Sequence, residues 1–141
     1  CDFVIASDTA TFSYPEVSIG IPTIVGAIRL PRKINWADAM ELLLLGEPIS
    51  AERAKEIGFV WKVCEPEGLM EEAVSLAEQL CQSAPLAVRA TKEVATRTQN
   101  MGWIEAVRFG ETMRIVSNQT KDATEGRAAF REKRKPQWKG N

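Results

Sequence analysis

Apolar positions recur at helical spacing through most of the chain, and only three short apolar runs have the length and composition of strands. The runs that predict strands cover residues 3–6, 11–14 and 59–63. The stretches that predict helices cover residues 36–45, 51–57, 69–80, a segment beginning at Ser83, 103–117 and 121–131. The chain is therefore expected to be mostly α-helical, with a few short strands.

Polar residues and glycines at the ends of these segments predict the helix boundaries. Asn35 and Ser50 are suited to cap helix N-termini, because their side chains can accept hydrogen bonds from the first turn. Gly46 and Gly58 stand where the same two helices should end. Ser83 marks the start of a further helix.

Two of the expected helices are apolar on more than one face. The helix over residues 36–45 carries leucines around most of its circumference, which predicts burial on most sides. On the helix over residues 103–117, Trp103 and Val107 share one stripe while Ile104 falls elsewhere. One core contact cannot bury all of these groups, so this pattern predicts a subunit interface and hence a homo-oligomer.

The first expected strand opens the sequence. It follows directly on Cys1 and Asp2, without an initiating methionine, and no earlier segment is present beside which it could pair. A strand requires hydrogen-bonding neighbours. We therefore expect the sequence to be the C-terminal part of a longer protein.

Length, charge and residue usage limit the class of protein. With 141 residues, 45% of them hydrophobic, the chain is expected to form one globular unit. Its net charge of -1 gives no reason to expect nucleic acid or a membrane surface as a partner, and no window has the apolar length of a transmembrane helix. The three cysteines lack disulfide or zinc-site spacing, which favours a reducing, cytoplasmic location without a metal site. The absence of histidine excludes Ser-His, Cys-His and His-ligated metal chemistry within the chain.

One carboxylate, that of Glu16, stands in an otherwise uncharged run over residues 9–27. Its neighbours Tyr14, Pro15 and Val17 favour partial desolvation, and desolvation favours the neutral form of a carboxyl group. Glu16 is therefore a candidate general acid or base. The same position also fits a solvated turn carboxylate or a helix N-cap, so the local sequence leaves all three interpretations open.

An ordered set of short motifs runs through the chain. In the first half the set comprises Cys1-Asp2, Ile5-Ala6, Phe12, Pro15-Glu16, Gly20, Pro22, Gly26, Arg29-Leu30, residues 45–51, Ala54, Gly58 and Val63. In the second half it comprises Ser83-Ala84-Pro85, Lys92, Glu125-Gly126, Ala129-Phe130 and residues 132–136. In their order and spacing these motifs resemble the crotonase superfamily, the enoyl-CoA hydratase/isomerase family in particular, over nearly the whole chain.

The resemblance implies an α/β fold of the crotonase type, which is a spiral of repeated strand-and-helix turns closed by a helical C-terminal region. Residues 1–65 are then expected to be the C-terminal end of the spiral core. Residues 66–141 are expected to be the helical region, which in the family contacts CoA and packs into trimers that often pair as hexamers.

The family binds acyl-CoA thioesters and passes through an enolate, whose oxygen is held by two backbone N–H groups. Glu16 matches the second of two glutamates that position a water molecule and move its proton. The first glutamate and both N–H donors come from family segments upstream of Cys1, so the 141-residue piece is expected to be inactive alone. The resemblance implies no cofactor apart from coenzyme A, which is part of the substrate.

The resemblance also places Pro22, Thr23, Ile24 and Gly26 in an active-site loop. The family usually has a glycine-rich turn here, which lets backbone N–H groups approach the substrate or its water. In this chain the loop is one residue shorter and carries β-branched side chains, which should narrow that approach. Hydration, double-bond isomerisation and other acyl-CoA reactions therefore stay open.

The C-terminal segment supplies a second candidate site. Phe130 and Lys133 match positions at which the family places an aromatic ring and a lysine against the adenine and phosphates of CoA. The alternative is that Phe130 is a core anchor and the basic run is merely solvated. Arg29 and Arg32 match positions that are often basic in the family, and for them a structural ion pair is expected.

Three functions stay open on the sequence. The favoured one is the C-terminal part of an enoyl-CoA hydratase or isomerase. The second is a crotonase-fold enzyme of another reaction class, such as a thioester hydrolase or a carbon–carbon lyase. The third is a non-catalytic module that serves oligomerisation alone.

Overall fold

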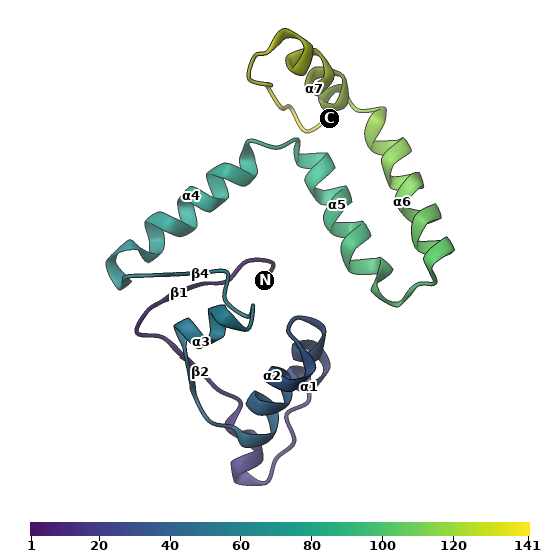
Figure 1. The fold of residues 1–141 in the computed structure, drawn as a ribbon. Coiled ribbons are helices and arrows are strands. Elements are labelled where there is room, and N and C mark those ends of the chain that lie inside the picture. Colours follow the sequence, from purple (N-terminus) through teal and green to yellow (C-terminus); the bar gives the residue numbers. More distant parts are fainter. The chain divides into compact units, whose positions relative to one another are not determined.

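The computed structural model describes residues 1–141 and shows two compact units, residues 1–76 and residues 77–141. In Figure 1 the first unit runs from purple to teal and the second from teal to yellow. The expectation of one globular unit is therefore wrong, because the contacts of each unit are mostly internal. The boundary between the units lies inside helix α4 (Leu69–Cys81), and the functional division expected at residue 65 stays a prediction.

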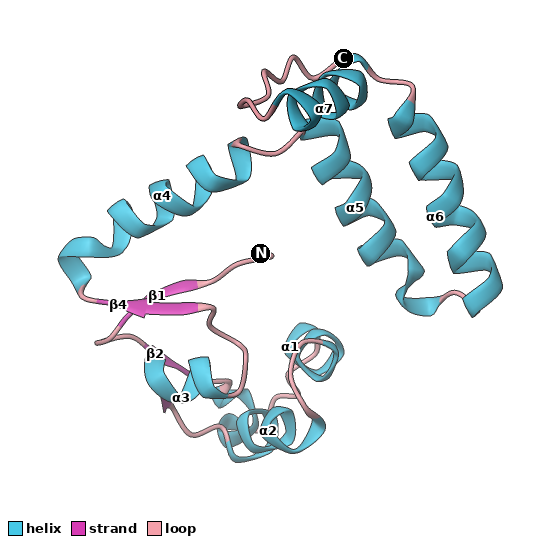
Figure 2. Ribbon diagram, turned by 45° about the horizontal axis from the view of Figure 1, so that its top comes forward, coloured by secondary structure: helices cyan, strands magenta, loops and turns pink.

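The strands form two small sheets within the first unit (Figure 2). β1 (Ile5–Ser7) pairs in parallel with β4 (Lys62–Cys64). β2 (Thr11–Phe12) pairs antiparallel with β3 (Ile49–Ser50). The first strand thus has one neighbour, which comes from later in the chain.

The strand expected over residues 59–63 begins later, with β4. The N–H groups of Phe59 and Val60 donate to the carbonyl oxygen of Ala54, at 2.8 and 2.9 Å. These bonds close the end of helix α3 (Ala51–Glu56). Because their N–H groups are engaged there, Phe59 and Val60 precede the ladder instead of joining it.

Short helices connect the strands of the first unit. The α-helices before α4 are α1 (Val25–Arg29), α2 (Trp36–Met40) and α3. The 3₁₀ helices are η1 (Pro15–Ile19), η2 (Leu30–Arg32) and η4 (Pro66–Gly68), and a π helix, η3 (Glu41–Leu45), continues α2. The helix expected over residues 36–45 is therefore α2 followed by η3.

The capping residues act as the sequence predicts. The Asn35 side chain accepts a hydrogen bond from the N–H of Asp38 at 3.1 Å, and the Ser50 side chain accepts one from the N–H of Arg53 at 3.2 Å. Gly46 ends η3 in the left-handed region, with φ 69°, where a side chain would be strained. These boundaries are confirmed because each depends on residues only a few positions apart.

The first unit has two hydrophobic clusters. One contains Leu30, Ile34, Ala39, Leu42 and Leu43. The other contains Ala6, Ala51, Ala54 and Val60. Ile49 and Phe59 pack against both, so β3 and the segment before β4 join the two clusters.

The expected burial of residues 36–45 on most sides is wrong for this chain. Leu42 and Leu43 are buried, whereas Trp36 and Leu45 are 69% and 62% exposed. The core lies on one side of this segment only. The periodic pattern reports which residues are apolar, but it does not report how many neighbours the helix has.

The second unit contains three helices and a tail. The helices are α5 (Pro85–Arg97), α6 (Trp103–Asn118) and α7 (Lys121–Glu132), with the 3₁₀ turn η5 (Thr98–Asn100) between the first two. α5 and α6 lie side by side (Figure 1). Pro85 is the first residue of α5, where its fixed φ is favourable, and Ala84 occupies the capping position. Ser83 lies before the helix and does not cap it.

The apolar side chains of α6 lie on its surface. No residue of this helix is buried, and Trp103, Ile104 and Val116 are 81%, 61% and 60% exposed. The two apolar faces expected from the sequence are thus present and uncovered in this chain. The subunit interface that they predict stays a prediction.

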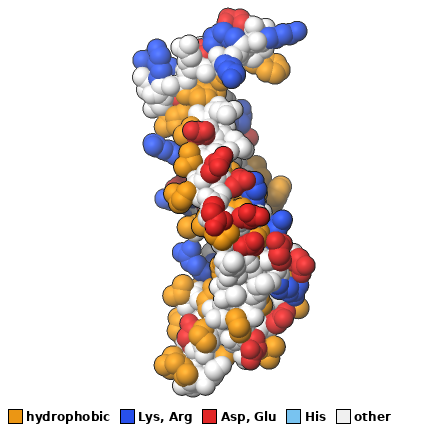
Figure 3. All heavy atoms as spheres, turned by 90° about the vertical axis from the view of Figure 1, so that its left-hand side faces the viewer, with side chains coloured by type: hydrophobic (Ala, Val, Ile, Leu, Met, Phe, Trp, Pro, Cys, Tyr) orange, Lys and Arg blue, Asp and Glu red, His pale blue; other side chains and the backbone are white.

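Acidic side chains gather along α4. Glu71 and Glu78 are exposed, and red atoms lie along the middle of the face shown in Figure 3. Glu72 contacts the Lys62 Nζ atom at 2.6 Å, which ties the first turn of α4 to β4. No helix in the chain combines the length and the apolar character that crossing a membrane requires.

Candidate active site

Glu16 lies in η1, which begins at Pro15 and is followed by Gly20 in the left-handed region, with φ 79°. Its carbonyl oxygen accepts a hydrogen bond from the N–H of Ile21 at 3.0 Å, so its backbone is fixed. Tyr14 occupies the capping position of η1, and no side chain caps this helix. The interpretation of Glu16 as an N-cap is therefore wrong.

The side chain of Glu16 lines a cavity of about 380 Å³ within the first unit. The other lining residues are Tyr14, Pro22, Thr23, Ile24, Val25, Gly26 and Arg29. All the residues assigned to the active-site loop thus come together with Glu16, because the chain passes within a few residues from η1 into α1. Their functional roles stay predictions.

Two side-chain oxygens in the walls of this cavity are buried without a hydrogen-bond partner in the chain. They are Oε2 of Glu16 and Oγ1 of Thr23. This carboxylate oxygen is therefore shielded from solvent, while Glu16 as a whole is half-buried, so both its acid–base role and its interpretation as a turn carboxylate stay predictions. Leaving a buried polar group unpaired costs about 1–3 kcal/mol, so the pair identifies a place where a polar ligand would be favourable.

Gly26 allows the residues around the cavity to approach closely. It is buried, and a Cβ atom at this position would lie 2.5 Å from the Tyr14 ring and 2.7 Å from the Thr23 methyl group. Real Cβ contacts essentially never fall under 3.0 Å. Any other residue would therefore displace the ring or the methyl group, so glycine is required here by close packing.

The β-branched residues Ile24 and Val25 line the cavity but are 61% and 68% exposed. Most of each side chain thus faces solvent, and the predicted narrowing of the approach to substrate stays a prediction.

Arg29 also lines the cavity. Arginine ion pairs in the chain involve Arg53, Arg97, Arg114 and Arg134. The structural ion pair expected for Arg29 and Arg32 is not formed within this chain.

Phe130 projects from α7 and is 87% exposed, so the interpretation of it as a core anchor is wrong. It lines a groove of about 680 Å³ within the second unit. The other lining residues are Ala84, Asn118, Asp122, Ala123, Thr124, Gly126, Arg127, Arg131 and Trp138. Lys133 is not among them, since it ends α7 with φ 53° in the left-handed region.

Two arginines not assigned to a site from the sequence, Arg127 and Arg131, supply the cations of this groove. Helical geometry explains the grouping, because residues three and four positions apart are neighbours on a helix surface. Arg127 is three residues before Phe130 and four before Arg131. This spacing was the available signal, whereas the choice of Lys133 rested on the resemblance alone.

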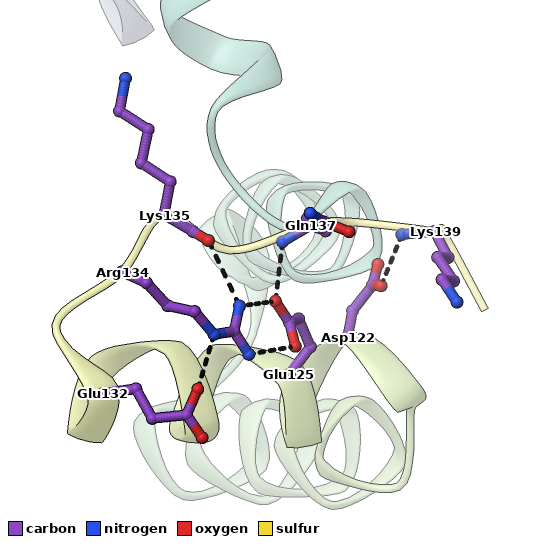
Figure 4. Close-up of polar contacts among 7 residues, drawn as sticks. All are labelled: Asp122, Glu125, Glu132, Arg134, Lys135, Gln137 and Lys139. Carbon is purple, nitrogen blue, oxygen red and sulfur yellow. Dashed lines mark hydrogen bonds and ion pairs between the residues drawn. The ribbon is translucent and has the colours of Figure 1, made fainter.

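A folded tail supplies Trp138 to the groove, and a carboxylate on α7 holds that tail (Figure 4). Glu125 accepts hydrogen bonds from Arg134 Nη1 and Nη2 at 2.5 and 2.9 Å, and from the backbone N–H of Gln137 at 2.8 Å. The Arg134 guanidinium, followed by the Gln137 N–H, lowers the pKa of Glu125 to about 2. The same contact raises the pKa of Arg134.

Asp122, at the start of α7, holds the last residues of the chain. It is only 2% exposed, and its carboxylate accepts hydrogen bonds from the N–H groups of Lys139 and Gly140 at 2.7 and 2.9 Å (Figure 4 shows the first). The N–H of Lys121 donates in turn to the carbonyl oxygen of Asn141 at 2.9 Å. The first turn of α7 and the tail therefore exchange hydrogen bonds in both directions.

Trp138 completes the attachment of the tail. Its Nε1–H donates to the carbonyl oxygen of Gln82 at 2.7 Å. Its ring lies against Gly126, where a Cβ atom would be only 3.2 Å from it. The ring is thus held between α7 and the segment that follows α4.

The whole sequence, residues 1–141, matches the family described as enoyl-CoA hydratase/isomerase. The chain belongs to this family. Curated relatives in the enoyl-CoA hydratase/isomerase family include a carnitinyl-CoA dehydratase from Salmonella arizonae and a probable enoyl-CoA hydratase from Rhizobium meliloti. Each is 39% identical, over 145 and 140 residues respectively, and each match covers 99% of this chain. The matches cover 56% and 54% of the relatives, so the chain spans a little over half of their length.

Solved structures of the family confirm the fold class. An enoyl-CoA hydratase from Mycobacterium tuberculosis H37Rv superposes with a TM-score of 0.95 at 36% identity, covering 99% of this chain and 56% of that one. An enoyl-CoA hydratase from Bacillus anthracis gives a TM-score of 0.95 at 36% identity, with 100% and 55% coverage. The chain therefore has the crotonase-type fold expected from the resemblance, over the C-terminal part of these proteins.

Proposed function

We propose that the whole protein adds water to the C2=C3 bond of an enoyl-CoA, or removes it from the 3-hydroxyacyl-CoA, with Glu16 as the general acid or base. The observation that carries this proposal is the buried, unpartnered Oε2 of Glu16 beside the predicted active-site loop. A carboxylate shielded from bulk water is suited to exchange a proton with a bound water molecule or with a carbon atom. The hydratase and dehydratase names of the relatives support both directions of the reaction.

The proposed reaction conserves all atoms and electrons. In hydration the water oxygen forms a bond to C3, and the π electrons of the C2=C3 bond move into the thioester as an enolate. The attacking water gives up one proton and C2 gains one as the enolate collapses; Glu16 carries out one of these two transfers, and the second glutamate of the family the other. The net change is the addition of H and OH, so the reaction requires no electron carrier, and coenzyme A enters as part of the substrate.

The groove of the second unit is the proposed contact for the CoA part of the substrate. The exposed ring of Phe130 offers a stacking face for adenine, while Arg127 and Arg131 offer cations for phosphates. Lys133 stays a candidate on the resemblance alone. The uncovered apolar faces of α6 support a homo-oligomer, a trimer or a hexamer, as part of the same proposal.

Isomerisation of the double bond is the second candidate function, because the active-site loop departs from the glycine-rich turn at which the family admits water. In such a reaction the same carboxylate would move a proton between two carbon atoms without adding water. Product analysis separates the candidates: a 3-hydroxyacyl-CoA indicates hydration, a shifted double bond indicates isomerisation, and a free CoA thiol indicates thioester hydrolysis. Carbon–carbon cleavage would shorten the acyl chain, and a purely structural module would give no product.

We infer that the 141-residue chain has no hydratase activity by itself. Glu16 is the only carboxylate that lines the cavity, and the family uses a second glutamate and two N–H donors from other segments. Hydration of a short enoyl-CoA by this chain at the rate of the whole protein would contradict the inference.

The decisive experiment replaces Glu16 by glutamine in the whole protein. Glutamine keeps the shape and one oxygen of the side chain but cannot exchange the proton. We expect kcat for the hydration of crotonyl-CoA to fall about 10²- to 10⁴-fold, because general acid–base catalysis contributes about that much. KM should change little, since the substitution leaves the cavity intact.

Glu47→Gln is the matched control, because Glu47 is an exposed glutamate of the same unit and does not line the cavity. This control should keep full activity. A Glu16→Gln protein that retains more than about a tenth of the kcat would remove Glu16 from the acid–base role. Thermal unfolding of both variants, measured alongside, separates a catalytic loss from a folding defect.

A further inference from the structure

Among residues 1–141, the side-chain polar atoms that are buried without a hydrogen-bond partner number only two, and both belong to the cavity of the first unit. Oε2 of Glu16 comes from η1, and Oγ1 of Thr23 comes from the segment between η1 and α1. Unpaired buried oxygens are rare in folded proteins. Their occurrence in the walls of one cavity points to a shared ligand.

The two groups are chemically complementary toward one kind of partner. An ionised carboxylate only accepts hydrogen bonds, whereas a threonine hydroxyl both donates and accepts. An oxygen that carries at least one hydrogen, such as that of an alcohol or a water molecule, can donate to Glu16 and accept from Thr23 at the same time. A carbonyl group or a hydrocarbon can satisfy only one of the two groups, or neither.

Close packing fixes the position of Thr23 relative to this site. Its methyl group lies next to Gly26, at 2.7 Å from where a Cβ atom would stand, and the Tyr14 ring contacts the same glycine. The side chain is therefore confined by its methyl group, which leaves the hydroxyl as the group available for a ligand. Valine has the same shape without the hydroxyl, so Thr23→Val removes the hydrogen bond and keeps the packing.

We propose that the Thr23 hydroxyl binds the oxygen on C3 of the substrate, which is the attacking water in hydration and the 3-hydroxyl group in dehydration. This inference rests on the proposed function and adds a specificity-determining residue to it. Thr23 would favour ligands with a 3-hydroxyl group over otherwise identical ligands that lack one. The bond is purely a binding contact, and Thr23 exchanges no proton with the substrate.

Calorimetric binding by the whole protein tests the proposal with two probes, 3-hydroxybutyryl-CoA and butyryl-CoA, which differ only in the 3-hydroxyl group. Both are measured in a Glu16→Gln background, which prevents turnover. Adding Thr23→Val should weaken 3-hydroxybutyryl-CoA about five- to tenfold, as expected for one hydrogen bond, and butyryl-CoA less than about twofold. Thr23→Ser, which keeps the hydroxyl, should restore most of the preference.

Each other outcome overturns the proposal. An equal loss of both probes with Thr23→Val would show that Thr23 acts only through packing. An unchanged affinity for 3-hydroxybutyryl-CoA would show that the hydroxyl does not contact the ligand. If neither probe binds the protein with threonine in place, the proposed function itself is wrong and the inference is overturned with it. Thr23→Ala, which also removes the hydroxyl, takes the place of Thr23→Val should that variant fail to fold, with Thr23→Ser as the comparison.

Discussion

Replacing Asp122 by alanine should release the C-terminal tail from α7. Asp122 is the buried charged residue of the chain, at 2% exposure, and its carboxylate holds the N–H groups of Lys139 and Gly140 at 2.7 and 2.9 Å. Alanine fits on α7 without strain, because it is the best helix former. The substitution therefore removes the two hydrogen bonds while leaving the helix intact.

The expected size of the effect follows from these contacts. A hydrogen bond to a charged group contributes about 1.5–3 kcal/mol, and the two bonds of Asp122 act on the same short segment. The freed N–H groups can reach water once the tail detaches. We therefore expect the substitution to lower the free energy of detaching the tail by about 3 kcal/mol, which corresponds to one strong bond plus part of the second. Each 1.4 kcal/mol is a factor of ten, so the open form of the tail should become about a hundred times more populated.

Amide hydrogen exchange in the whole protein measures this population directly. The amide protons of Lys139 and Gly140 exchange only when the carboxylate releases them, so their exchange should accelerate about a hundredfold in the Asp122→Ala protein. The indole fluorescence of Trp138 should shift toward that of a solvated ring. The amides in the middle of α6 should not change, because the tail opens locally.

Two controls sharpen this test. Asp122→Asn keeps one side-chain oxygen, so it should retain one bond and show a smaller acceleration than Asp122→Ala. Asp8→Ala removes an exposed aspartate of the first unit and should leave the tail unchanged. Exchange at Lys139 and Gly140 that is unaltered in the Asp122→Ala protein would refute the reasoning, since it would mean that the other tail contacts alone determine the opening.

Two further results are expected from the second unit. The pKa of Glu125 is lowered to about 2 from an ordinary 4.5, so Glu125 should stabilise the attached tail above pH 4.5 and lose this contribution as the pH falls toward 2. The fluorescence of Trp138, followed over this pH range, should show the change. The Glu125→Gln substitution should abolish this pH dependence. The same pH dependence of Trp138 fluorescence in the Glu125→Gln protein would contradict this. Phe130→Ala should weaken CoA binding by the whole protein about tenfold, as the loss of one stacking contact, with little change in unfolding temperature because the ring is 87% exposed. Ile115→Ala, an exposed apolar residue on α6, should leave CoA binding unchanged, and equal losses for the two variants would contradict a specific role for Phe130.

Local features of the fold could be predicted from the sequence because their causes are local. Asn35 and Ser50 cap their helices through bonds to residues three positions later. The helices over residues 103–117 and 121–131 are observed as α6 and α7, with ends that differ by one residue. In each case a residue and its partner lie within one helical turn.

Features that depend on distant partners could not be predicted in the same way. The strand expected over residues 59–63 was misplaced because two N–H groups bond to Ala54, which no periodic pattern reveals. The tail attachment joins Asp122 to Lys139 and Gly140, which lie 17 and 18 residues later. A carboxylate that accepts backbone N–H groups has no sequence motif, since every residue except proline offers the same donor.

In the candidate site, too, the features with local causes could be predicted from the sequence and the others could not. The partial shielding of Glu16 is predictable because its uncharged neighbours are adjacent in sequence, and one of its carboxylate oxygens is buried. The buried hydroxyl of Thr23 is not predictable from the sequence, because no local pattern shows which side-chain atoms the fold shields from solvent. Phe130 is a candidate on the resemblance, whereas the cations beside it, Arg127 and Arg131, follow from helical spacing on the helix that the sequence predicts.

Two kinds of group in this chain lack a partner, namely buried polar oxygens and exposed apolar side chains, and each kind favours a different kind of partner. The two unpaired oxygens of Glu16 and Thr23 are polar and buried, so a polar ligand in the cavity would satisfy them. The exposed apolar residues of α6, among them Trp103 and Ile104, lie on an accessible surface that the proposed homo-oligomer would cover. In the proposed function, substrate pairs the buried oxygens and a neighbouring subunit covers the apolar residues of α6. The proposed catalytic and oligomeric roles therefore rest on different atoms, and a variant that abolishes one should leave the other measurable.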